Sequence, residues 1–126
     1  MKALFIVINH EDHFNELLKE FASSGITGGT ILESEGLAAS QAEQAPELGM
    51  NYFRLFLNQG RPYNKTIFLI AEGEQLEKAK NCVRKVVGSL GKENVGIMFT
   101  VDVDSFEGLT TVSYTHLRAH ETLRYL

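Results

Sequence analysis

Few residues in this chain of 126 have the type and spacing that catalysis or metal binding requires. His116 and His120 stand four positions apart, which is the spacing of two metal ligands on one helix face. Cys82 is the single cysteine, and we interpret it as a small buried hydrophobic residue. Asp102 and Asp104 alternate at a predicted strand end, where solvated carboxylates are the simplest interpretation. Apart from the histidine pair, no pattern suggests an enzyme.

The histidine pair falls within a C-terminal segment that resembles a translated sequencing-library adapter. Residues 112–121 are Val-Ser-Tyr-Thr-His-Leu-Arg-Ala-His-Glu, which is the translation, in order, of a common transposon-based adapter. The adapter places the bases CT ahead of this frame, and Thr111 is one of the few residues whose codon ends that way. We therefore predict that residues 112–126 are a non-native tail and that the native chain continues differently after about residue 111.

With the tail set aside, His10 and His13 remain, and we interpret them as solvated polar residues. We therefore predict no catalytic residue and no metal site, and we do not expect an enzyme. This interpretation leaves binding and regulation as the functions to consider.

The composition predicts one cytoplasmic globular domain. Hydrophobic residues make up 44% of the chain and charged residues 22%, with two prolines, so a packed core is expected rather than disorder. Residues 3–8 are apolar but too short to span a membrane, and no cleavage site follows them. The net charge of −4, without a basic run, argues against nucleic acid and membrane partners. A protein or small-molecule partner is expected.

The hydrophobic pattern predicts alternating strands and helices. Phe14, Leu17, Leu18 and Phe21 form one helical stripe, which Asn9 precedes as a candidate cap. No sustained period appears between about residues 35 and 65, which is typical of a functional loop. The predicted elements are a strand at 3–9, a helix at 10–24, a strand at 27–34, a strand at 66–71, a helix at 74–90 and a strand at 95–103.

This order predicts an α+β fold of the ferredoxin-like βαββαβ type, an antiparallel sheet with two helices on one face. Residues 4–7 are consecutive apolar residues, so the first strand presents apolar side chains to both faces of the sheet. Since the helices cover one face only, we expect a homo-oligomer to bury the other.

Several motifs then resemble one known family. The run Gly25-Ile-Thr-Gly-Gly-Thr-Ile-Leu-Glu33, with Gly36, resembles the second strand of nitrogen-regulatory PII proteins, which leads into their large T-loop. Gly49, Tyr52 and Phe56 are similar to a later T-loop segment. Gly91-Lys92, Gly96 and Phe99 are similar to the B-loop and last strand. The resemblance covers residues 1–109 and agrees with the order of the predicted elements.

The resemblance implies a homotrimer in signal transduction whose clefts between subunits bind ATP or ADP as an effector. No cofactor is required. It implies a T-loop over residues 35–65 that docks on a transporter, an enzyme or a regulator. The nucleotide-binding residues that it implies are Thr30, Gly36, Gly91, Lys92 and Gly96. In the loop it implies Tyr52, Phe53, Phe56 and Arg61 for partner binding or modification, with Tyr52 at the position that some members have nucleotidylylated.

The chain also departs from the family pattern. Ile97 stands where the family has a phosphate-binding lysine, which leaves Lys92 for that part. Ala38, Ala39 and Ser40 replace residues that the family associates with 2-oxoglutarate, so sensing of that ligand is not expected. Two alternatives stay open: a trimer of the divalent-cation tolerance type, and a ligand-free interaction module of the same fold.

Overall fold

The computed structural model describes residues 1–44, 57–58, 61–88 and 95–108. They form an α+β structure with a four-stranded antiparallel sheet, a separate pair of short strands and three helices. The elements are β1 (Lys2–Ile8), α1 (Glu11–Ser23), β2 (Thr30–Glu33), α2 (Leu37–Gln44), β3 (Leu57–Asn58), β4 (Arg61–Pro62), β5 (Lys65–Ala71), α4 (Gly73–Val87) and β6 (Gly96–Asp102). The predicted α+β class is confirmed.

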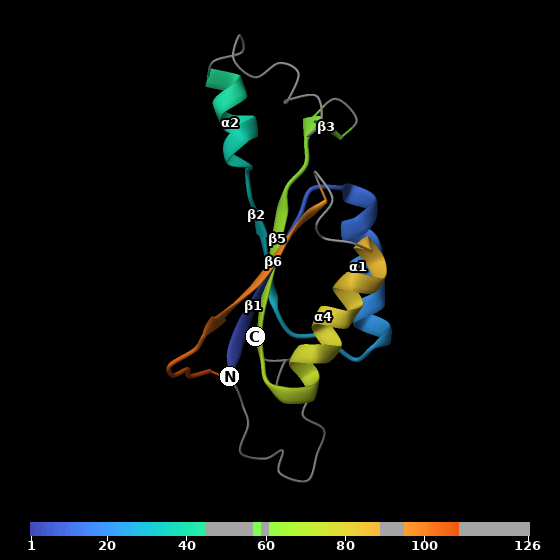
Figure 1. The fold of residues 1–126 in the computed structure, drawn as a ribbon, viewed down its shortest axis with the longest axis vertical. Coiled ribbons are helices and arrows are strands. Elements are labelled where there is room, and N and C mark those ends of the chain that lie inside the picture. The colour runs from blue at the N-terminus through green and yellow to red at the C-terminus, as the bar shows by residue number, and fades with distance from the viewer. Residues whose placement is uncertain (45–56, 59–60, 89–94, 109–126) are drawn as a thin grey trace.

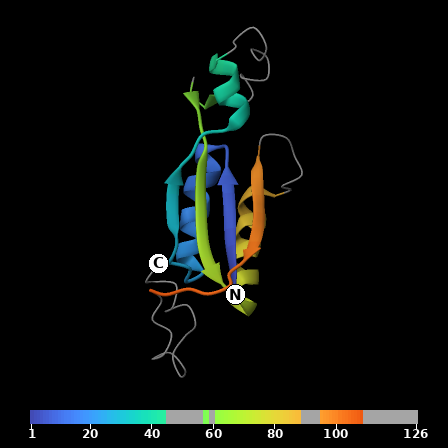
Figure 2. The ribbon, with the colours of Figure 1, turned by 90° about the vertical axis from the view of Figure 1, so that its left-hand side faces the viewer.

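The sheet has the strand order β2-β5-β1-β6, so β1 lies between β5 and β6. The register places Phe5 opposite both Phe68 and Phe99. Helices α1 and α4 lie side by side on one face, while α2 extends beyond one end of the sheet (Figure 1). Figure 2 shows the opposite face, which no described helix covers. We call this the outer face.

The core forms between the sheet and the two helices that cover it. Alternate residues of β1 and β5 point into it, so Leu4, Ile6, Ile8 and Leu69 have no exposed surface. From α1 the buried residues are Phe14, Leu17 and Phe21, and from α4 they are Leu76, Ala79, Cys82, Val83 and Val87. Leu18 was predicted in the same stripe, but it is 38% exposed because it lies at the edge of the helix contact.

The region from about residue 35 to 65 differs from the expected irregular loop. It begins with the helix α2 and includes the short antiparallel pair of β3 and β4. The α2 sequence LAASQAEQ has good helix formers but no apolar stripe. The helix therefore escaped detection by periodicity.

Candidate functional site

A cavity of about 260 Å³ lies at the end of the sheet from which α2 extends. Four separate stretches of chain meet there, from the end of β1, from the starts of β5 and β6, and from the start of α2. Its lining consists of Val7, Asn9, Gly36, Leu37, Ala38, Ala39, Tyr63, Asn64, Gly96 and Ile97. Val7 and Ile97 are cross-strand neighbours on the outer face, so the cavity is continuous with that face. We take it as the candidate effector site.

Gly96 allows β6 to approach β1 closely at the cavity. Its φ of 146° is one that residues with side chains rarely adopt, and a Cβ atom there would lie 2.1 Å from the carbonyl oxygen of Val7. The same junction is held by a hydrogen bond from the Asn9 amide to the Val95 carbonyl oxygen, at 3.3 Å. A glycine is therefore required where the last strand enters the site.

Gly36 brings the start of α2 to the cavity. Its carbonyl oxygen accepts a hydrogen bond of 3.0 Å from the Ser40 amide, which makes it the residue just before the first helical turn. The amides of Leu37, Ala38 and Ala39 have no acceptor within the helix, as in any first turn. Because these residues line the cavity, the positive end of the α2 dipole lies at its wall.

A line of polar side chains joins the strand ends beside the cavity. Ser34 contacts the side-chain oxygens of Asn64 and Thr66, with 2.9 Å between its Oγ and Thr66 Oγ1. The Asn64 amide nitrogen then donates to Asn9 Oδ1 at 2.9 Å. This line runs from the end of β2 through the start of β5 to the end of β1. Asn9 was predicted as a helix cap, but it serves this network, and His10 occupies the N-cap of α1 without a side-chain bond.

Lys65 forms a second set of polar contacts next to Tyr63, which lines the cavity. Lys65 Nζ lies 3.2 Å from a Glu33 carboxylate oxygen and 4.9 Å from the centroid of the Phe14 ring, which in turn packs edge-on against Tyr63. The hydrogen bond to Glu33 raises the pKa of Lys65. Burial raises the pKa of Tyr63, the charge of Lys65 opposes this, and the carboxylates of Glu11 and Glu33 add to it. Lys65 and Tyr63 therefore stay protonated at neutral pH.

Among the described residues, the lining carries no charged side chain. It offers amide and hydroxyl groups from Asn9, Asn64 and Tyr63, apolar walls, and the free backbone amides of α2. Such a lining suits a small ligand that combines an apolar ring with hydrogen-bond acceptors.

The structure brings together two of the residues that the sequence motifs indicated, Gly36 and Gly96. Thr30 lies apart from them, because it begins the edge strand β2 and pairs with Phe68 half-way along β5. Gly91, Lys92, Tyr52, Phe53 and Phe56 lie outside the described residues. Arg61 lies in β4, and its side chain is outside the described part.

Sequence analysis did not identify Asn9, Tyr63 and Asn64 as site residues. For Asn9 the available signal was a polar residue directly after an apolar strand, which a helix cap explained equally well. Tyr63 and Asn64 come directly before an apolar strand, where polar loop residues are ordinary.

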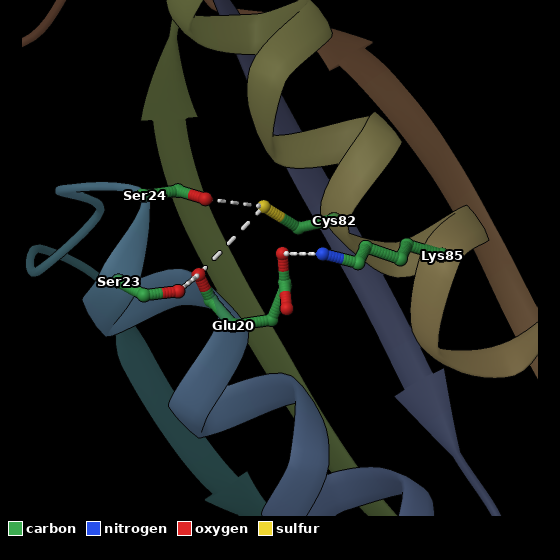
Figure 3. Close-up of polar contacts among 5 residues, drawn as sticks. All are labelled: Glu20, Ser23, Ser24, Cys82 and Lys85. Atoms are coloured by element: carbon green, nitrogen blue, oxygen red, sulfur yellow. Dashed lines mark hydrogen bonds and ion pairs between the residues drawn. The ribbon is translucent and has the colours of Figure 1, made fainter.

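A wider groove of about 390 Å³ lies between α1 and α4, with Cys82 at its floor. The Cys82 thiol contacts Ser24 Oγ at 3.4 Å and the Glu20 carbonyl oxygen at 4.0 Å, and Lys85 Nζ bonds the Glu20 carboxylate at 3.0 Å (Figure 3). Cys82 is 5% exposed, which confirms its interpretation as a small buried residue.

Metal binding finds no support in the described part of the chain, where no three His, Cys, Asp or Glu side chains are placed to share an ion. The rings of His10 and His13 pack edge-on, with centroids 5.3 Å apart. No helix among the described residues has the length and apolar character needed to cross a membrane.

Neither a family model nor a curated protein matches the sequence.

Proposed function

We propose that the chain is a PII-like signal-transducing regulatory protein. It binds a small effector, with an adenine nucleotide favoured, and controls a partner protein through the segment at residues 35–65. The observation that carries the proposal is the cavity at the base of that segment, where Gly36 and Gly96 meet. An effector bound there touches the first turn of α2, so occupancy can alter the segment that meets the partner.

The strand order supports the family resemblance. Counting only strands of the main sheet, β2-β5-β1-β6 places the second, third, first and fourth strands side by side. We propose that this is the ferredoxin-like arrangement, with α1 and α4 as its two helices. The position of the long segment between the second and third strands then corresponds to that of a T-loop.

A homotrimer completes the proposed site. Ligand pockets commonly have volumes of about 300–1,000 Å³, and this cavity has about 260 Å³. A nucleotide therefore needs additional walls. The cavity borders the apolar outer face through Val7 and Ile97, so a neighbouring subunit packed on that face supplies such a wall.

The charge of a nucleotide phosphate also needs compensation. Among the described residues that line the cavity, only the backbone amides at the start of α2 provide a positive electrostatic potential. Gly91 and Lys92 are the proposed complement, since loop amides cradle phosphates and a lysine neutralises them. Thr30 is proposed to contribute from the outer face, and Tyr52, Phe53, Phe56 and Arg61 to contact the partner.

A thermal-shift screen of the full chain with ATP, ADP, AMP, cyclic dinucleotides and 2-oxoglutarate tests the proposal. A ligand at about a hundred times its dissociation constant adds about 2.7 kcal/mol, which raises the Tm by several degrees. We expect a shift with an adenine nucleotide that disappears in Lys92→Ala and persists in Lys19→Ala, a control on α1. No shift with any compound would favour the ligand-free interaction module.

A further inference from the structure

Asn64 is a cavity residue whose side chain also forms hydrogen bonds to two neighbouring strand ends. It lies directly before β5, and its side chain reaches the end of β1 on one side and the end of β2 on the other. It also lines the cavity, whereas Ser34 and Thr66 do not. Asn64 is therefore the residue at which the proposed effector site and the line of polar side chains meet.

The hydrogen bonds along this line run in one direction. The single hydroxyl proton of Ser34 goes to the Asn64 side-chain oxygen, so Thr66 must donate to Ser34. Asn64 then donates from its amide nitrogen to Asn9. Each donor in such a chain polarises the next, so a change at Asn64 is felt at both ends. The backbone repeats the link, because the Ser34 amide donates to the Asn64 carbonyl oxygen at 3.4 Å.

The Asn64 amide also faces the start of α2. Its nitrogen lies 3.8 Å from the place where a Cβ of Gly36 would be. The nitrogen carries two hydrogens, and within the described part of the chain Asn9 takes one of them. The second is available to an acceptor in the cavity beside Gly36.

We infer that Asn64 is a positioning residue that binds an acceptor atom of the effector and transmits occupancy to the strand ends that carry residues 35–63. The inference rests on the proposed function. When an effector takes the second amide hydrogen, the side chain is held between ligand, Asn9 and Ser34. The end of β2 and the start of β5 are then fixed together, and with them the entrance to α2.

Two substitutions separate the two tasks of this side chain. Asn64→Ala removes both the contact to the effector and the line of bonds. Ser34→Ala interrupts the line but leaves the cavity lining intact, because Ser34 is not part of it. Asn15→Ala, on the exposed side of α1, is the matched control for loss of an asparagine.

The measurements are calorimetric titration with ATP, ADP and AMP, and amide hydrogen exchange at position 34 with and without nucleotide. We expect nucleotide to slow this exchange in the wild-type chain. In Asn64→Ala we expect affinity to fall about tenfold, as for one lost hydrogen bond, and the ligand effect on exchange to vanish. In Ser34→Ala we expect affinity within about threefold of the wild type, without the slowing. Asn15→Ala should match the wild type.

The outcomes separate this inference from the proposed function. Wild-type chain that binds none of the nucleotides overturns both. Wild-type binding that Asn64→Ala leaves unchanged overturns this inference alone, as does slowing of exchange that survives in Ser34→Ala. If Asn64→Ala fails to fold by circular dichroism, Asn64→Asp replaces it. That variant keeps the acceptor for Ser34 but has no amide hydrogen for the effector, so affinity should again fall.

Discussion

At the scale of single residues, Gly96 is the clearest case of a position that only glycine can occupy. A Cβ atom would lie 2.1 Å from Val7 O, and the φ of 146° is itself unfavourable for other residues. We expect Gly96→Ala to reduce the free energy of unfolding by about 3 kcal/mol, from backbone strain and the forced separation of β1 and β6. Urea unfolding followed by circular dichroism measures this loss.

Gly88→Ala is the control for that substitution. Gly88 ends α4 with a φ of 69°, and nothing lies within 4 Å of its Cβ position. The cost there is the backbone conformation alone, about 2 kcal/mol. Equal losses for the two variants would show that the contact with Val7 contributes nothing.

The ion pair of Lys2 and Asp102 predicts a pH effect. The hydrogen bond from Lys2, followed by its charge, lowers the pKa of Asp102 below its usual range. A lowered pKa means that Asp102 stabilises the fold above the pKa of the unfolded chain, and that this contribution disappears as the pH falls through the folded-state pKa. Carboxyl NMR titration should show a lowered midpoint that returns to the usual range in Lys2→Met. An identical midpoint in both proteins would contradict this cause.

The residues of the site were only partly predictable. Gly36 and Gly96 stood within motifs, and glycines mark places of close backbone approach, so the sequence indicated both. Asn9 and Asn64 are 55 positions apart, and no local pattern connects them. Their hydrogen bond exists because β1 and β5 are antiparallel neighbours, which becomes visible only in the assembled sheet.

At the scale of elements, α1 offers a test of what holds a helix to the sheet. Leu17 has no exposed surface, while Leu18, the next residue, is 38% exposed. Leu17→Ala should therefore cost about 3 kcal/mol of unfolding free energy through lost burial and an incompletely closed cavity. Leu18→Ala should cost less than about 1 kcal/mol. Denaturant unfolding of both variants measures the difference, and similar losses would mean that α1 packs in another orientation.

Elements with a strong apolar pattern were predicted well, and those without one were not. The helices α1 and α4 carry stripes that face the core, and their ends lie within three residues of the predicted ones. By contrast, β2 covers only residues 30–33 of the predicted 27–34. The helix α2 was missed because it packs little, with Leu37 being 75% exposed. A hydrophobic period in the sequence reflects packing of a helix against a core, and α2 forms with little such packing.

At the scale of the whole molecule, the outer face is the main unexplained surface. Phe68, Phe5 and Phe99 stack across three strands of it, with ring centroids 5.5 and 5.1 Å apart. On β6, Ile97, Phe99 and Val101 are each between 43% and 54% exposed. A continuous apolar surface of this kind is typical of an interface between proteins. In the proposed trimer it is buried, and the same contact closes the effector cavity.

Oligomeric state tests that proposal. We expect the full chain to sediment as a trimer. Phe99→Glu places a carboxylate in the centre of the proposed interface, where burying a charge without a partner costs about 3 kcal/mol, or about a hundredfold in dissociation constant. Leu18→Glu is the matched control, because Leu18 is 38% exposed and Phe99 43%, but Leu18 lies on α1.

Analytical ultracentrifugation over a range of concentrations distinguishes the variants. Phe99→Glu should dissociate at concentrations where the wild-type chain and Leu18→Glu remain trimeric, while all three keep the same far-ultraviolet circular dichroism. Dissociation should also weaken nucleotide binding in Phe99→Glu, although Phe99 does not line the cavity, because the wall supplied by the neighbouring subunit is lost. A monomeric wild-type chain that still binds nucleotide would contradict the trimer. It would mean that one subunit alone provides all the walls of the effector site.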